Sequence, residues 1–212
     1  MDGKRMKVYC IPVGMLQTNC YILACEDTKK AIIVDPGDEG AKIDSLIKNE
    51  GLDPILVVNT HAHYDHIGAD RYFHDKGIPI AIHKLDSQLL MAGGGAEILG
   101  SHSTPNPAPD RYLEEGDTIE FGNQTLSVIF TPGHSPGSIS LYSKKYNVLF
   151  CGDTLFCRSI GRTDLPGGDY DTLMHSLREK LSKLPGETIV YPGHGPDTDI
   201  EGENKFNPWL LI

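Results

Sequence analysis

The chain has 212 residues, of which 39% are hydrophobic and 23% charged, a composition typical of a folded globular protein. Its 19 basic and 29 acidic residues give a net charge of −10, which argues against a nucleic-acid partner because a phosphate backbone requires a basic surface. No apolar run approaches the about 18 residues that a membrane-spanning helix needs, so no membrane partner is expected.

In the first half of the chain, short strands are predicted to alternate with helices. Apolar runs bounded by turn residues predict strands at residues 7–11, 20–25, 31–34, 55–58 and 78–82. A helix is predicted between the third and fourth of these, with Ile43 and Ile47 on its apolar face. A second helix is predicted after residue 58, with Asp65 at its N-cap and Gly77 at its end.

Residues 91–111 differ from their surroundings because they carry three consecutive glycines and three prolines. They predict a mobile surface loop with at most one helical turn, either a tolerated insertion or a flap beside a site. Further strands are predicted at residues 118–121, 126–130, 138–142, 148–150 and 188–191. A helix beginning near Asp169 carries a regular leucine stripe: Leu173, Leu177, Leu181 and Leu184. Because the composition does not change at any candidate linker, we expect a single α/β domain over residues 1–212.

The five cysteines are odd in number and never spaced as C-x-x-C: Cys10, Cys20, Cys25, Cys151 and Cys157. Residues 1–5 lead into a strand with no apolar signal segment behind them. Both observations favour reduced, mostly buried thiols in a cytoplasmic protein, and we expect no cysteine to act as a nucleophile.

The stretch NTHAHYDHIGAD, residues 59–70, places His61, His63, Asp65 and His66 within six positions. Two histidines two residues apart in an extended segment project to the same face. Asp65 and His66 follow on the turn into a helix, whose different backbone can aim them at a neighbouring point. Polar groups this dense are costly to bury without a partner, so the stretch predicts a metal site.

Three later apolar runs each end in a side chain that can bind metal: LSVIFTPGH in His134, NVLFCGD in Asp153, and TIVYPGH in His194. In open α/β architectures, ligands bind outside the carboxyl ends of the strands. A glycine precedes each of the three and would let the backbone turn sharply: Gly133, Gly152 and Gly193.

Together with the first cluster, the candidate metal ligands are five histidines and two aspartates, which is more than one tetrahedral zinc ion can bind. Two divalent ions about 3.5–4 Å apart, sharing a carboxylate and a water, fit the count.

These motifs resemble the metallo-β-lactamase superfamily, and within it the short form of the glyoxalase II-like (hydroxyacylglutathione hydrolase-like) branch. The resemblance rests on THAHYDH, TPGHSPGS, CGDTLF followed by SIGRTDLPGGD, and YPGHGPDT, and runs from about Lys7 to Thr198. It implies a four-layer αβ/βα sandwich, the metallo-β-lactamase fold, with a dinuclear site at one edge of two facing mixed sheets. Longer glyoxalase II enzymes carry a C-terminal extension whose basic residues grip glutathione. The tail here holds only Lys205, so the identity of the thiol stays open.

The resemblance also implies a role for each ligand. His61, His63 and His134 would hold the first metal, Asp65, His66 and His194 the second, and Asp153 would bridge the two. Zinc is the expected metal, with iron or manganese as alternatives. Asp35, in IIVDPG, would support the His61–His66 loop by hydrogen bonds without touching metal; the alternative is an ordinary turn residue before Pro36.

The activity implied is hydrolysis of a thioester such as S-lactoylglutathione or another acyl-thiol. A metal-bound hydroxide would attack the carbonyl carbon, and Asp65 could orient it in addition to binding metal. Arg162 would meet a substrate carboxylate, or would instead form a structural ion pair with Asp164. The expected partner is a small-molecule acyl-thiol, and the expected assembly is a monomer or a small homo-oligomer.

Other functions stay open. Persulfide dioxygenases of the same superfamily are similar in HAHxDH and in a GRTD stretch, yet use a single iron. A lactonase of the superfamily and a metal-bound protein without catalysis are further alternatives. The histidines outside the motifs are expected to be structural: His74, His83, His102 and His175.

Overall fold

The first of two sheets comes from the N-terminal half of the chain. The computed structural model describes residues 5–100 and 104–211. This sheet runs in chain order: β1 (Met6–Val13), β2 (Thr18–Cys25), β3 (Lys30–Val34), β4 (Asp53–Val58), β5 (Ile80–His83) and β6 (Arg111–Leu113). The pairs β1–β2 and β2–β3 are antiparallel, and the pairs from β3 to β6 are parallel. Helix α1 (Gly40–Asn49) makes the crossover from β3 to β4.

The second sheet comes from the C-terminal half. Its strand order is β14 (Thr198–Asp199), β13 (Ile189–Pro192), β10 (Val148–Gly152), β9 (Ile139–Ser143), β8 (Gln124–Phe130) and β7 (Thr118–Phe121). Strands β10 and β13 are parallel, whereas their neighbours pair antiparallel. A short ribbon of β11 (Leu155–Phe156) and β12 (Ser159–Ile160) lies beyond β10. Both sheets are therefore mixed.

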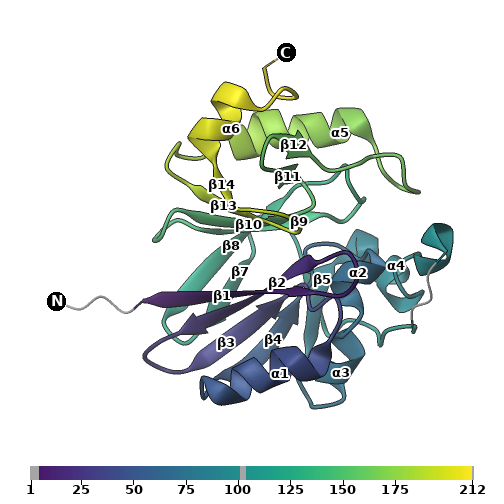
Figure 1. The fold of residues 1–212 in the computed structure, drawn as a ribbon, viewed down its shortest axis with the longest axis vertical. Coiled ribbons are helices and arrows are strands. Elements are labelled where there is room, and N and C mark those ends of the chain that lie inside the picture. The colour runs from purple at the N-terminus through teal and green to yellow at the C-terminus, as the bar shows by residue number, and fades with distance from the viewer. Residues whose placement is uncertain (1–4, 101–103, 212) are drawn as a thin grey trace.

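The two sheets face each other, and helices cover their outer faces (Figure 1). Helices α1 and α3 (Asp70–His74) lie outside the first sheet. Helices α5 (Tyr170–His175) and α6 (Ile200–Phe206) lie outside the second. This is the four-layer αβ/βα sandwich that the sequence predicts. Within the described residues, no helix has the length and apolar character needed to cross a bilayer.

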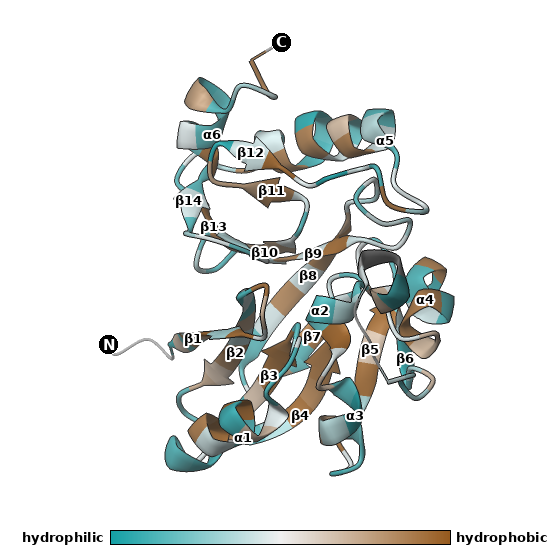
Figure 2. Ribbon diagram, turned by 45° about the vertical axis from the view of Figure 1, so that its right-hand side comes forward, coloured by the Kyte–Doolittle hydropathy of each residue, from teal (hydrophilic) through white to brown (hydrophobic). Residues whose placement is uncertain are grey.

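Three apolar clusters fill the three spaces between these layers. Strand β2 shows the arrangement most directly, because all eight of its residues are buried. Ile22 and Ala24 belong to the cluster with α1 and α3, while Tyr21 and Leu23 belong to the cluster between the sheets. A third cluster joins the second sheet to α5 and α6. A strand covered on both faces needs a continuous apolar sequence, and Figure 2 shows hydrophobic residues concentrated along β4 and β5.

All the strands predicted from apolar runs are confirmed, with shifts of at most two residues at their ends. The helix near Asp169 is confirmed as well, because the Asp169 carboxylate caps α5 by accepting from the Thr172 N–H at 2.8 Å. It continues as a π turn, Ser176–Lys180, and a 3₁₀ turn, Leu181–Lys183, and its leucine stripe faces the third apolar cluster. The short strands β6, β11, β12 and β14 and helix α6 were not predicted.

The single helix predicted from Asp65 to Gly77 is wrong in two respects. It is divided into α2 (Tyr64–Ile67) and α3, because the Ala69 N–H bonds to the Pro36 carbonyl at 2.8 Å instead of continuing the helical ladder. The N-cap is His63, and Asp65 lies within the first turn of α2. The carboxylate of Asp65 is thereby free to face the neighbouring sheet.

The predicted loop at 91–111 contains one helical turn, η2 (Ala96–Leu99), after helix α4 (Ser87–Met91). The Gly94 carbonyl accepts the Tyr64 N–H at 3.1 Å, which brings this segment beside the motif at 59–70. Of the two readings, a tolerated insertion and a flap beside the site, this position agrees with the flap.

One fully buried carboxylate, Glu203 of α6, fixes the C-terminal layer. Its Oε1 accepts from Arg158 Nη1 at 2.8 Å and from Thr198 Oγ1 at 2.6 Å. Its Oε2 accepts from the Arg158 N–H at 3.0 Å and from Asn207 Nδ2 at 2.7 Å. The carboxylate thus joins three chain segments at one point.

We predict that Glu203→Gln lowers the free energy of unfolding by about 1–3 kcal/mol, because an amide cannot accept all four hydrogen bonds. Urea denaturation should show a lower midpoint at an unchanged m-value. Glu201→Gln is the matched control, since Glu201 is exposed and, among the described residues, its carboxylate pairs with Lys205 on the same helix. Equal midpoints for the two variants would show that the buried network adds no stability.

Candidate metal centre

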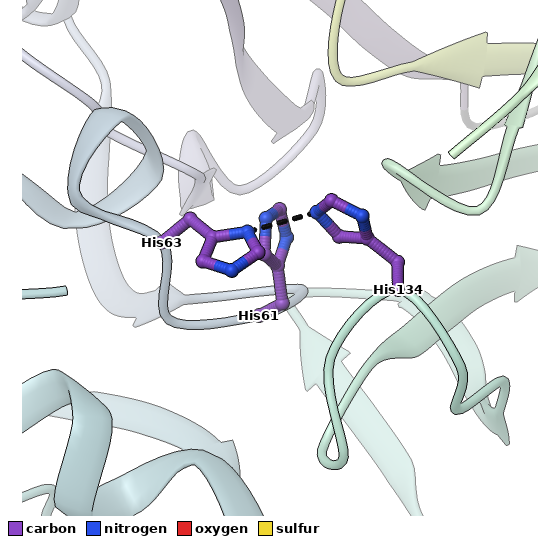
Figure 3. Close-up of side chains that lie close together, drawn as sticks. All are labelled: His61, His63 and His134. Atoms are coloured by element: carbon purple, nitrogen blue, oxygen red, sulfur yellow. Dashed lines mark hydrogen bonds between the residues drawn. The ribbon is translucent and has the colours of Figure 1, made fainter. Parts of the chain in front are cut away.

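Three imidazole rings converge where the first sheet meets the second. His61 and His63 leave the loop after β4, and His134 leaves the loop between β8 and β9 (Figure 3). One nitrogen from each ring lies within 4.8 Å of the others, and His63 Nδ1 is 2.8 Å from His134 Nε2. Three nitrogens so close to one common point form a site that a cation can occupy.

A second cluster lies beside the first. Asp65 Oδ2 is 3.1 Å from His194 Nε2 and 3.6 Å from His66 Nε2, and the two histidine nitrogens are 3.4 Å apart. His194 follows β13 of the second sheet, so this cluster also joins the two halves of the chain. The His61 and His66 rings are 4.1 Å apart at their centroids, which makes the two clusters immediate neighbours.

Asp153, after β10, stands between the clusters. Its Oδ1 is 3.4 Å from His66 Nε2, while its Oδ2 is 3.6 Å from both His134 Nε2 and His194 Nε2. One carboxylate therefore reaches nitrogens of both clusters. This is the position that the bridging role predicted for Asp153 requires.

Hydrogen bonds on the far side of two rings settle which nitrogen faces the centre. His134 Nδ1 donates to the Arg162 carbonyl at 2.8 Å, and His194 Nδ1 donates to the Leu16 carbonyl at 3.1 Å. A carbonyl oxygen only accepts, so each Nδ1 carries the proton and each Nε2 keeps its lone pair. The lone pairs therefore point into the clusters, as metal coordination needs.

Asp35 performs the same task for His66 and is completely buried. Its Oδ2 accepts from His66 Nδ1 at 3.0 Å and from Thr60 Oγ1 at 2.6 Å, and its Oδ1 accepts from the Thr60 N–H at 2.7 Å. Because the Thr60 hydroxyl donates to Asp35, it is left to accept from His61 Nδ1 at 3.1 Å. These contacts match the supporting role predicted for Asp35 rather than that of an ordinary turn residue.

The two clusters differ in their electrostatics. Burial and the neighbouring imidazoles lower the pKa of His61 well below its usual value, and burial together with His134 lowers the pKa of His63 to about 4. Burial also acts on His66, but the surrounding carboxylates, Asp153 foremost, outweigh it and raise the pKa of that ring. The surroundings thus disfavour protonation of His61 and His63 in the first cluster, whereas carboxylates favour protonation of His66 in the second.

The donor set fits a pair of metal ions. Among the described residues, His61 Nε2 and Asp153 Oδ1 are buried with no hydrogen-bond partner. Orphaned buried acceptors are costly, and a cation satisfies them without a donor. Imidazoles and carboxylates together suit zinc, iron or manganese.

Glycines permit the close approach of these loops, two by their backbone conformation and one because it has no side chain. Gly133 and Gly152 have φ of +131° and +49°, which confirms the predicted sharp turns. Gly193 also lies in a bend of the chain, but its φ is not positive. A Cβ there would lie 2.1 Å from Asp153 Oδ1, so glycine is required for space.

A cavity of about 250 Å³ opens onto both clusters. Its remaining walls are largely apolar and come from five segments: Leu16, Tyr64, Leu89, Gly94, Gly95, Leu165 and Pro166. Arg162 also lines it, but its guanidinium forms a bidentate pair with Asp164 at 2.7 and 2.8 Å. The ion pair with Asp164 is therefore formed, and the contact of Arg162 with a substrate carboxylate stays a prediction.

The histidines expected to be structural lie outside the clusters. His83 stacks on Phe130 at 4.3 Å between centroids and caps a 3₁₀ turn by accepting from the Leu85 N–H. His74 lies 3.8 Å from Asp110, and His175 is exposed on α5. His102 lies outside the described residues.

Sequence reasoning missed several residues of the site. Thr18 Oγ1 donates to Asp65 Oδ2 at 2.9 Å, and no motif marks Thr18. Leu16 and Leu89 reach the cavity from segments far away in the chain. Thr60 could have been suspected, since it directly precedes His61 in the motif.

Two facing mixed sheets between helices, with histidine and aspartate clusters at their strand ends, define a metallohydrolase architecture. The sequence matches the Metallo-beta-lactamase superfamily over residues 13–194, and the chain belongs to this family. It is 43% identical to the probable metallo-hydrolase YqgX of Bacillus subtilis, covering 97% of this chain and 98% of that protein. It is 34% identical to the hydroxyacylglutathione hydrolase GloC of Haemophilus influenzae, with the same coverage.

A third relative is the mitochondrial persulfide dioxygenase ETHE1 of Bos taurus, 33% identical over 92% of this chain and 72% of that protein. Among solved structures, the BLEG-1 B3 metallo-beta-lactamase superposes with a TM-score of 0.91 at 42% identity, covering 97% of this chain and all of that one. TTHA1623 in a di-iron-bound form superposes at 0.87 with 39% identity, covering 95% and 100%.

We predict that Asp35→Asn lowers metal affinity about 10- to 100-fold, the usual cost of losing a support behind a histidine ligand. If the amide oxygen keeps the bond from the Thr60 N–H, the NH₂ group faces His66 Nδ1. The proton of His66 then moves to Nε2 and blocks coordination. Competition with a chromophoric chelator measures the affinity.

Asp70→Asn is the control for this substitution. Asp70 is a buried carboxyl group bonded to Asn59, and burial raises its pKa well above the usual value. A neutral amide therefore resembles the native group. Equal metal affinities for Asp35→Asn and wild type would show that Asp35 does not orient His66.

Proposed function

We propose that this protein is a dinuclear metallohydrolase that cleaves thioesters of a small thiol. The observation that carries the proposal is Asp153, whose carboxylate lies within 3.6 Å of nitrogens in both clusters. Such a pair of joined sites suits two ions better than one. The similarity to a hydroxyacylglutathione hydrolase supports the thioester as substrate.

The proposed ligands are those implied by the sequence: His61, His63 and His134 for one ion, Asp65, His66 and His194 for the other, with Asp153 shared. When bound, two divalent ions lower the pKa of a shared water and polarise a carbonyl group. Zinc is our first choice, and iron or manganese suits the same donors. The di-iron-bound form of the structural neighbour TTHA1623 supports iron as an alternative.

Asp65 is the proposed catalytic carboxylate. Thr18 donates to its Oδ2, and its side chain lines the cavity, so its position is defined before substrate enters. There it can accept a hydrogen bond from the attacking water and hold that water against the substrate carbonyl. Burial opposes ionisation, yet His66 and His194 hold the pKa of Asp65 below its usual range, which keeps it an acceptor at neutral pH.

The cavity suits a thioester in two ways. Its apolar walls, including Leu89 and Leu165, can enclose an acyl chain and exclude bulk water. A thiolate is a stable leaving group near pH 8, so no dedicated general acid is required. Apart from the histidines, the one basic side chain among the described residues lining the cavity is that of Arg162, already paired with Asp164.

We further propose a cytoplasmic protein of a single domain that acts on a small acyl-thiol and on neither nucleic acid nor membrane, as a monomer or small homo-oligomer. The net charge of −10 supports the exclusion of nucleic acid.

A second candidate is a persulfide dioxygenase with one iron, which the similarity to ETHE1 favours. The same histidines and carboxylates can bind iron as well as zinc, so metal content separates the candidates. One iron per chain with rapid persulfide-dependent oxygen uptake would favour the dioxygenase.

We predict two divalent ions per chain in purified protein and hydrolysis of thioesters by the same sample. Metal content is measured by elemental analysis, and turnover by release of free thiol. The panel includes S-lactoylglutathione, an uncharged thioester, a lactone and a β-lactam, since one structural neighbour is named a B3 metallo-beta-lactamase.

Removal of the metal by a chelator should abolish turnover, and zinc should restore it. Fully loaded protein that cleaves the lactone or the β-lactam but no thioester would contradict the proposed substrate.

We predict that Arg162→Ala raises KM about fivefold for a thioester with a free carboxylate and leaves KM for an uncharged one unchanged. The magnitude is that of an exposed ion pair of about 1 kcal/mol. Asp164→Asn should act oppositely, because it releases the guanidinium for the substrate. If KM changed equally for both substrates, Arg162 would not contact the substrate carboxylate and would serve only in its ion pair with Asp164.

A further inference from the structure

A completely buried carboxylate, Asp86, stands behind the three-histidine cluster without belonging to it. It ends the 3₁₀ turn η1 (Lys84–Asp86) that follows β5. Its Oδ2 accepts from the Ala62 N–H at 3.0 Å and from Ser135 Oγ at 2.7 Å, and its Oδ1 accepts from the Gly137 N–H at 2.6 Å. Three donors from two loops thus satisfy one carboxylate.

Two of these donors stand next to a predicted ligand in the sequence, and the third, Gly137, lies in the same loop as His134. Ala62 stands between His61 and His63, and Ser135 directly follows His134. The first loop leaves β4 of the first sheet, and the second joins β8 to β9 of the second sheet. Asp86 therefore connects the two halves of the cluster across the boundary between the sheets.

The second loop is stiff enough to transmit this connection. Ser135 Oγ lies 2.7 Å from Ser138 Oγ, which also accepts the Ser135 N–H at 3.1 Å. A Cβ on Gly137 would lie 2.6 Å from Asp86 Oδ1, so the loop is packed directly against the carboxylate. Movement of Asp86 would carry Ser135, and with it the backbone of His134.

The fold has a separate connection between these loops that does not use Asp86. The Ile139 N–H donates to the Thr60 carbonyl at 2.8 Å. An apolar residue at position 86 would leave three buried donors unpaired, so the carboxylate also contributes to stability. What the carboxylate adds is the relative placement of two loops.

We propose that Asp86 is a positioning residue that holds His134 in register with His61 and His63, and thereby sets the metal affinity of the three-histidine cluster. The inference rests on the metal centre of the proposed function but not on its substrate. It assigns Asp86 no contact with metal or substrate.

The test measures Co²⁺ binding to each cluster separately. His194→Ala leaves the three-histidine cluster complete and removes a ligand of the other, whereas His63→Ala does the reverse. On the first background, Asp86→Asn should lower Co²⁺ affinity about 10-fold or more, the usual cost of a lost supporting contact, and shift the visible d–d bands. On the second background, the same substitution should change the affinity less than twofold.

Ser135→Ala provides a second variant, because it removes one of the three hydrogen bonds and leaves the carboxylate in place. It should weaken the three-histidine cluster in the same direction as Asp86→Asn, but less. Glu203→Gln is the control for stability, since it destabilises a buried carboxylate network remote from the clusters and should leave both affinities unchanged.

Wild-type affinity and spectrum in folded Asp86→Asn would overturn the inference, as would an equal loss at both clusters. If Asp86→Asn does not fold, unchanged affinity in Ser135→Ala overturns it instead. A wild-type chain that binds no Co²⁺ would overturn the metal centre itself and this inference with it, and that failure appears before any substitution is made.

Discussion

Imidazole nitrogens that face one another at short distance need a proton or a cation between them, and this constraint governs the candidate metal centre. His63 Nδ1 and His134 Nε2 are 2.8 Å apart, and His66 Nε2 and His194 Nε2 are 3.4 Å apart. Hydrogen bonds on the far side of the His66, His134 and His194 rings prevent them from turning away. The protein thus holds these nitrogens in the arrangement that binding of a metal ion requires.

The sandwich supplies the rigidity that this arrangement needs. Each ligand loop leaves a strand whose neighbours cover it on both sides, so the backbone before every ligand is fixed by buried packing. Carboxyl ends of strands from both sheets meet at one edge, where contacts such as that of Asp86 with Ser135 join them. The fold and the centre therefore depend on each other, although Glu203 stabilises a remote layer independently.

Charge then divides the centre into unequal parts. Three imidazoles form one cluster, while the carboxylates of Asp65 and Asp153 lie in and beside the other. Apolar walls around them strengthen every electrostatic interaction with a bound substrate, because water is displaced from the cavity. The pairing of Arg162 with Asp164 leaves the entrance without a free positive charge from that residue.

The sequence by itself predicted the strand pattern and the side chains that gather in the two clusters. Buried strands such as β2 appear in the sequence as apolar runs. The histidines that follow other strands can be recognised because several polar groups are rarely buried together without a bound partner. Only the tertiary structure decided which groups stand behind the ligands. Thr18, Asp86 and the carbonyl of Leu16 lie far from their partners in the chain, and local patterns carry no signal for such contacts. The break between α2 and α3 escaped prediction for the same reason, since it depends on a hydrogen bond to the Pro36 carbonyl of a distant turn.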